Sequence, residues 1–196
     1  MLLRTEKCLQ VSGGFFLLTV WFALVNGWKL LGMILSAAAI HELGHLGMLR
    51  YLGAKTRALR IGILGAVLET DCRNLSYGSE LAAVLAGPLA NFLCACLISC
   101  FAPGQDIFIG IHLALGGFNL LPIRPLDGGR GLELLLTWFF GPFAGEAAAR
   151  WIGAGTALVL ALFLGWLMKT TGGSLWLFPA MAGLLGTAGR EVLGNG

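Results

Sequence analysis

Two histidines and a glutamate stand close together in an apolar part of the chain. His41, Glu42 and His45 directly follow the apolar run 30–40. Residues four apart lie on one face of a helix, so both imidazoles can hold one zinc ion, while Glu42 lies beside the metal's water. The pattern therefore predicts a zinc site of the metalloprotease kind, with Glu42 as the catalytic base.

A catalytic zinc ion needs a third protein ligand and one open position. Asp127 is the best candidate, because it lies in the segment 119–130, where prolines end a helix and glycines let backbone approach a ligand closely. The alternative is that Asp127 only caps the helix after the turn, and the local sequence by itself favours this alternative. The isolated His112 is interpreted as a packing residue.

The composition points to a lipid environment. Hydrophobic residues make up 57% of the 196 residues and charged residues only 12%, against roughly 25% in soluble domains. Ionisable groups within membrane spans are costly and usually functional, which strengthens the zinc interpretation. The net charge of +3 is small and scattered, so nucleic acid is not expected as a partner.

The hydrophobic pattern predicts an all-α integral membrane protein with about six transmembrane helices. The expected spans are 11–28, 29–49, 79–101, 106–122, 151–169 and 174–189. Short β-branched runs within 56–77 predict a small membrane-associated β-hairpin. We expect a single domain over 1–196, with a core at 29–130, an amphipathic pair of short helices at 131–150 and C-terminal helices at 151–189.

The basic residues predict the orientation of the chain in the membrane. With a cytoplasmic N-terminus, 11 of the 13 lysines and arginines fall on the inner side, and only Lys29 and Lys169 lie outside. The expected localisation is the bacterial cytoplasmic membrane, crossed several times, with both termini in the cytoplasm.

The segments 41–45 and 119–129, taken together, closely resemble the two signature motifs of the site-2 protease family of intramembrane zinc metalloproteases. The resemblance implies that His41, His45 and Asp127 are zinc ligands and that Glu42 is the catalytic glutamate. The segment 86–91 also looks like the family's Gly-Pro core segment, although close packing of small residues explains it equally well. The order of elements resembles the sporulation-type branch, which processes pro-sigma-K.

The expected function is therefore zinc-dependent cleavage of a membrane-associated protein near the cytoplasmic face, such as a sigma-factor precursor or an anti-sigma factor. The Asn119 amide is the candidate for binding the substrate's oxyanion, and the edge of the hairpin at 58–70 could hold an extended substrate. The lipid bilayer and a membrane regulatory protein are the further expected partners. The alternatives are a membrane metal carrier or sensor and a non-catalytic homologue that binds membrane proteins.

Overall fold

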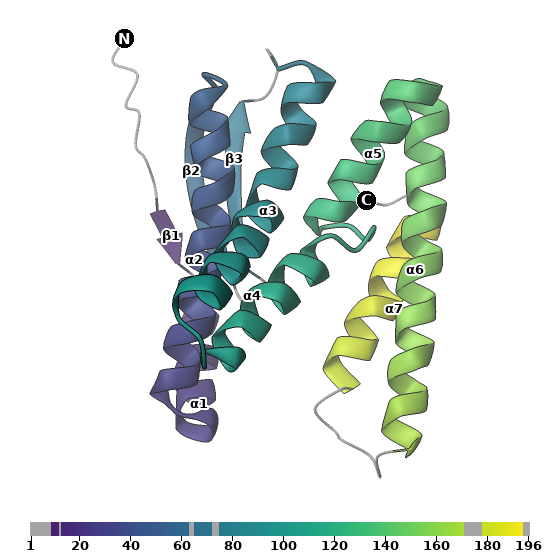
Figure 1. Ribbon diagram of the computed structural model, residues 1–196. Coiled ribbons are helices and arrows are strands. Elements are labelled where there is room, and N and C mark those ends of the chain that lie inside the picture. Colours follow the sequence, from purple (N-terminus) through teal and green to yellow (C-terminus); the bar gives the residue numbers. More distant parts are fainter. Residues whose placement is uncertain (1–8, 12, 63–64, 72–74, 171–177, 194–196) are drawn as a thin grey trace. The chain divides into compact units, whose positions relative to one another are not determined.

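The computed structural model describes residues 9–11, 13–62, 65–71, 75–170 and 178–193 of the chain. Seven helices and three short strands lie in this part of the chain (Figure 1). They are β1 (Leu9–Val11), α1 (Gly13–Asn26), α2 (Trp28–Tyr51), β2 (Lys55–Gly62), β3 (Gly65–Asp71), α3 (Tyr77–Phe101), α4 (Asp106–Asn119), α5 (Asp127–Phe140), α6 (Pro142–Thr170) and α7 (Phe178–Leu193). The chain divides into two compact units, Met1–Gly117 and Phe118–Gly196.

Each of the six apolar stretches contains a helix, but their lengths differ. Among the described residues, α2, α3 and α6 are long and apolar enough to cross a membrane, with 24, 25 and 29 residues. The helices α1 and α4 have only 14 residues each, and α7 has 16. The structure thus supports three membrane-spanning helices, and the crossing of the other three stays a prediction.

Local backbone chemistry explains two of the shifted boundaries. Gly27 has φ +89°, a conformation that L side chains rarely adopt, and it separates α1 from α2. The helix α4 ends at Asn119 instead of the expected residue 122. Pro122 disfavours helical geometry at the residue before it, which accounts for the earlier end.

On the long helices, large apolar side chains are exposed and small residues are buried, which is the opposite of the pattern in a soluble protein. On α3, Leu89, Leu93 and Leu97 are exposed, whereas Ala83, Gly87, Asn91 and Ala95 are buried. On α6, the buried residues are likewise small: Gly145, Ala149, Gly153, Ala154, Ala157 and Ala161. Small residues let membrane helices approach closely, so this pattern supports packing within a bilayer.

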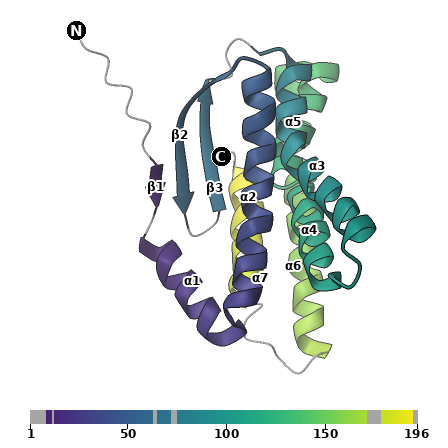
Figure 2. The same ribbon diagram turned by 60° about the vertical axis from the view of Figure 1, so that its left-hand side comes forward.

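The strands form one small sheet in the order β1-β2-β3. The predicted hairpin corresponds to β2 and β3, which pair antiparallel up to the Gly62–Gly65 pair, with an irregularity between Thr56 and Ala58. Figure 2 shows the sheet alongside α2. The strand β1, which pairs parallel with β2, was not predicted, because three residues are too few to show an alternating pattern.

The segment 131–150 differs from the expectation of two short helices. The helix α5 begins at Asp127 and ends at Phe140, and its C-cap residue Gly141 has φ +82°. Pro142 then starts α6, which continues without a break to Thr170 and so includes the expected fifth span. Proline is well tolerated in the first turn of a helix, so Gly141-Pro142 ends one helix and starts a long one.

Candidate metal centre

The two histidines of the motif lie one turn apart on α2 and face α3 within the first unit. Both Figures 1 and 2 show these helices side by side. The Nε2 atoms of His41 and His45 are 3.2 Å apart. Ligands of a tetrahedral zinc ion at 2.0–2.1 Å are separated from one another by roughly 3.3 Å. The described geometry therefore fits two nitrogen ligands of one zinc ion.

The helix α3 supplies hydrogen-bond partners to the other nitrogen of each ring. Nδ1 of His45 lies 2.8 Å from the Ala83 carbonyl oxygen, which can only accept, so the ring donates its Nδ1 proton. This leaves Nε2 of a neutral ring with its lone pair available to a metal. Nδ1 of His41 lies 3.2 Å from the Asn91 side-chain amide. Such outer partners fix the orientation of metal-binding imidazoles.

Glycines make room for this arrangement. A Cβ atom at Gly87 of α3 would overlap the imidazole of His45. A Cβ at Gly44 of α2 would lie 2.5 Å from the Ala86 carbonyl oxygen. A side chain at position 87 would displace the His45 ring, and one at position 44 would push against the backbone of α3. The two glycines therefore let α2 and α3 come close enough for the histidines to reach α3.

The three residues of the motif differ in how far they are exposed to solvent. His41 is only 5% exposed, while Glu42 and His45 are half-buried. Glu42 therefore remains accessible beside a largely desolvated imidazole. A carboxylate in this position can take a proton from a water molecule and pass it on.

Asp127 belongs to the second unit and occupies the first turn of α5. The N-cap of this helix is Leu126, without a side-chain cap hydrogen bond, so the interpretation of Asp127 as the N-cap residue is wrong. The half-buried carboxylate instead follows the cap, where the helix dipole favours a negative charge.

Close backbone contacts hold the Asp127 segment in place. A Cβ at Gly128 would overlap the Leu120 carbonyl, and one at Gly129 would lie 2.6 Å from the Ile123 carbonyl carbon. The two glycines therefore allow α5 to start directly against the preceding loop. Asn119, the expected oxyanion-binding residue, is the last residue of α4 and is half-buried.

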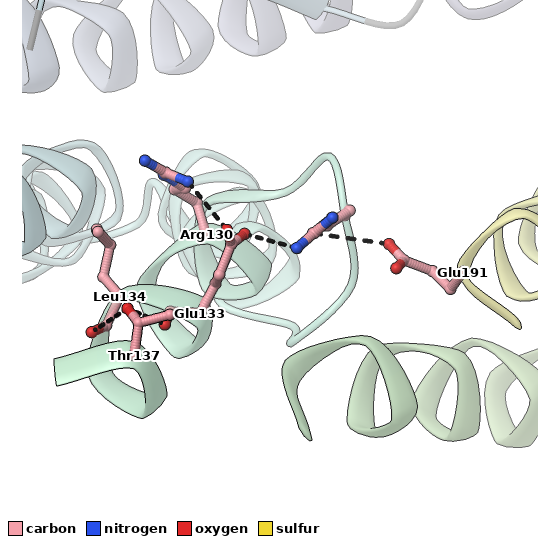
Figure 3. Close-up of polar contacts among 6 residues, drawn as sticks. Arg130, Glu133, Leu134, Thr137 and Glu191 are labelled. Carbon is pink, nitrogen blue, oxygen red and sulfur yellow. Dashed lines mark hydrogen bonds and ion pairs between the residues drawn. The ribbon is translucent and has the colours of Figure 1, made fainter. Parts of the chain in front are cut away.

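Ion pairs connect the same loop to two helices of the second unit. Arg124 lies 2.9 Å from Glu133 of α5 and 3.8 Å from Glu191 of α7. Arg130 also contacts Glu133, at 3.2 Å (Figure 3). The side chain of Glu191 is only 5% exposed. This network fixes the loop that precedes Asp127.

Sequence analysis missed two polar residues behind the histidines. Asn91 and His112 are both fully buried, and the Oδ1 atom of Asn91 lies 3.2 Å from Nδ1 of His112. His112 thus has a polar partner and is more than a packing residue. The signal was its position in an apolar helix, where an imidazole needs a hydrogen-bond partner, but the sequence could not show which residue provides it.

Comparisons with known proteins find zinc metalloproteases and a sporulation protein. The chain is 29% identical over 163 residues to a zinc metalloprotease of Methanocaldococcus jannaschii, which covers 76% of this chain and 48% of that protein. It is 30% identical over 122 residues to the stage IV sporulation protein FB of Bacillus subtilis, covering 58% and 42%. No protein-family model matches the sequence.

The chain spans about half, or less, of the length of these curated relatives. A solved structure, the site-2 protease from Methanocaldococcus jannaschii, matches with a TM-score of 0.63 and 24% identity over 92% of this chain and 88% of that one. The chain is thus similar in sequence to proteins named zinc metalloproteases and has the fold of a site-2 protease.

Proposed function

We propose that this protein is a membrane-embedded zinc endopeptidase that cleaves a membrane-associated protein near the cytoplasmic face. The observation that carries the proposal is the His41–His45 pair. Its Nε2 atoms are 3.2 Å apart on a helix long and apolar enough to span a membrane, and Glu42 lies between them in sequence. The names of the homologous zinc metalloproteases support the choice of metal and reaction.

We assign the third ligand position to Asp127. With His41 and His45, its carboxylate would give the two nitrogens and one oxygen that catalytic zinc sites use. Bound zinc would lower the pKa of a coordinated water toward about 7 and polarise the substrate carbonyl.

The chain's own residues then divide the remaining work. Glu42 accepts a proton from the attacking water and returns it to the leaving amine. Asn119 donates from its amide to the oxygen of the substrate carbonyl as negative charge develops there. The buried surroundings of His41 exclude bulk water and so strengthen these interactions.

The sheet offers a way to hold the substrate. A helical substrate hides its amides in internal hydrogen bonds, so the cleaved segment must be extended. Among the described strands, β1 occupies one edge of β2, and β3 pairs only with β2, which leaves the outer edge of β3 for strand addition. We propose that a substrate strand pairs there.

The proposed substrates are sigma-factor precursors or anti-sigma factors, and similarity to a stage IV sporulation protein supports testing a pro-sigma factor first. Co-expression with each candidate, followed by electrophoresis, would reveal a shortened product. Protein that holds zinc but cleaves no candidate would favour a metal carrier or sensor instead.

Replacing Glu42 with Gln tests the reaction itself. The amide cannot carry the proton, so cleavage should fall by about 10²–10⁴-fold. Zinc content should stay near stoichiometric, because no ligand is removed. Purified Glu42→Gln would be assayed for zinc by elemental analysis and for cleavage in detergent, and turnover at the wild-type rate would refute the mechanism.

The proposed topology places both termini and the loop after α2 in the cytoplasm. Reporter fusions after Lys55 and after Arg190 should then report the cytoplasm, and one at Gly104, in the α3–α4 connection, should report the outer side. The opposite pattern would overturn both the topology and the cytoplasmic active site.

A further inference from the structure

A buried carboxylate on the helix α7 faces the loop that leads to Asp127. Glu191 lies near the end of α7, and its side chain is only 5% exposed. Its Oε1 atom is 3.8 Å from Nε of Arg124, and its Oε2 atom has no hydrogen-bond partner among the described residues. A buried carboxylate without a nearby cation is costly, and the described structure places Arg124 beside this one. The position of α7 at this point therefore depends on Arg124.

Arg124 is held between carboxylates from two helices. Its guanidinium lies 2.9 Å from Glu133 of α5, in addition to the contact with Glu191. Figure 3 shows Glu133 and Glu191 on different helices. The side chain of Glu133 is 18% exposed, more than three times the exposure of Glu191. Charges in buried surroundings are screened less by water and salt, so the attraction to Glu191 is the less screened of the two.

A short turn transmits the position of Arg124 to Asp127. The backbone amide of Leu126 donates to the carbonyl oxygen of Ile123 at 2.8 Å, which closes the turn 123–126 around Arg124 and Pro125. Ile123 is buried, and the ring of Pro125 fixes its own φ angle. Leu126 is the N-cap of α5 and Asp127 is the first residue of that helix. A shift of Arg124 would therefore move the start of α5.

The three helices of the second unit contact this loop in different ways. A Cβ at Gly129 of α5 would lie 2.6 Å from the Ile123 carbonyl carbon, and one at Gly153 of α6 would lie 3.2 Å from the Pro122 carbonyl oxygen. The helices α5 and α6 thus approach the loop backbone directly, whereas α7 reaches it through the Glu191 side chain. A substitution of Glu191 can therefore release α7 from the loop without disturbing these backbone contacts.

We propose that Glu191 is a positioning residue for Asp127 and acts through Arg124. The ion pair holds the turn 123–126 in one place, and this turn sets the position of the Asp127 carboxylate. A ligand that is already held in place loses less conformational entropy when the metal binds, so the pair raises zinc affinity. This inference rests on the proposed function, in which Asp127 is the third zinc ligand.

The first test is the zinc affinity of Glu191→Gln, measured on the full chain in detergent by competition with a chelator. The amide has the shape of the carboxylate but no charge. Affinity should fall by about 2–30-fold, as expected for a residue that acts on a site without touching the ligand. The matched control is Glu146→Gln, which removes an exposed acidic residue of α6 and should bind zinc as the wild type does. Unchanged affinity in Glu191→Gln would overturn the inference.

A double-mutant cycle tests whether Glu191 acts through Arg124. Arg124→Met removes the cation and should weaken zinc binding. Adding Glu191→Gln to this variant should leave zinc affinity as it is, because the connection is already broken. The melting temperature should rise in the double variant, because a buried charge without a partner has been removed. Losses of affinity that add independently would contradict the proposed route.

A conservative variant separates positioning from a general loss of stability. Arg124→Lys keeps the positive charge and should bind zinc more tightly than Arg124→Met. If the ion pair served only to stabilise the fold, the variants would melt at lower temperatures but bind zinc with wild-type affinity while folded. Equal zinc affinities of Arg124→Lys and Arg124→Met would therefore contradict the inference.

Hydrogen–deuterium exchange of zinc-free protein tests the loop independently of the metal. In Glu191→Gln, the amides of Ile123 and Leu126 should exchange faster than in the wild type, because α7 no longer holds the turn. Unchanged exchange there, in a wild type that binds zinc, would overturn this inference and leave the proposed function standing. Failure of the wild type to bind zinc would be seen directly as absent metal, and it would overturn the proposed function together with this inference.

Discussion

The histidine pair and the Asp127 segment are built in different ways. His41 and His45 lie on one continuous helix, and neutral, buried hydrogen-bond partners on α3 hold their rings. Asp127 stands where a loop turns into α5, and backbone contacts and ion pairs hold the loop before it. The first region depends on side-chain fit between helices, whereas the second depends on backbone approach and charge.

Because of this difference, substitutions in the two regions should have different effects. A substitution at the histidine pair can displace a side chain without moving the backbone. A substitution in the Asp127 segment either introduces a side chain that overlaps backbone atoms or removes a charge. The predictions that follow test the comparison from the largest expected effect to the smallest.

The largest effect is expected from Asp127→Asn, which removes the charge and keeps the shape. If Asp127 ligates zinc, affinity should fall by more than the roughly 10–100-fold that outer partners cost, and cleavage should fall with it. Chelator competition and a cleavage assay measure both quantities. The matched control is Asp106→Asn, which changes an acidic residue in the first turn of α4 and should leave both quantities nearly unchanged. Retained zinc and activity in Asp127→Asn would place the third ligand elsewhere.

A second experiment compares Gly87→Ala with Gly128→Ala. The new methyl at position 87 meets the imidazole of His45, which can move, so thermal stability should change little while zinc affinity falls about 10–100-fold. The methyl at position 128 meets the Leu120 carbonyl, which cannot give way without a backbone shift. Gly128→Ala should therefore lower the melting temperature clearly.

Thermal denaturation and zinc titration of both glycine variants would decide this comparison. Gly110→Ala is the control, because a Cβ there meets nothing within 4 Å. If Gly87→Ala and Gly128→Ala lost stability equally, the proposed difference between side-chain fit at the histidine pair and backbone approach at the Asp127 segment would be wrong.

The smallest effect is expected from Glu133→Gln, which weakens the ion pairs with Arg124 and Arg130 (Figure 3). Partly exposed ion pairs contribute about 1 kcal/mol or less, so cleavage should fall only a few-fold. Screening by salt should reduce the gap between variant and wild type. Cleavage rates at low and high salt measure this, and a large, salt-independent loss would mean that Glu133 does more than hold the loop.

Much of the fold and half of the site could be predicted from local patterns. The spacing of His41 and His45 and the periodicity of a helix are enough to place both imidazoles on one face. Apolar length likewise predicted α2, α3 and α6, and β-branched runs predicted the β2–β3 hairpin. Gly141-Pro142 also predicted the break between two helices after position 140. The sequence did not predict that α6 runs on without a break past residue 150, because the small residues there fit both a loop and a packed helix.

The sequence by itself determined the spacing of the two histidines, the apolar stretches and the Asp127 motif, because these depend on residue type and on spacing along a single element. Only the tertiary structure decided which groups contact the proposed zinc-binding histidines. Asn91, 50 positions after His41, bonds to that ring, and His112, 71 positions after His41, bonds to Asn91. Both contacts form because Gly44 and Gly116 let three helices approach. A hydrogen bond requires two groups within about 3 Å, and no local pattern encodes that distance between separate helices.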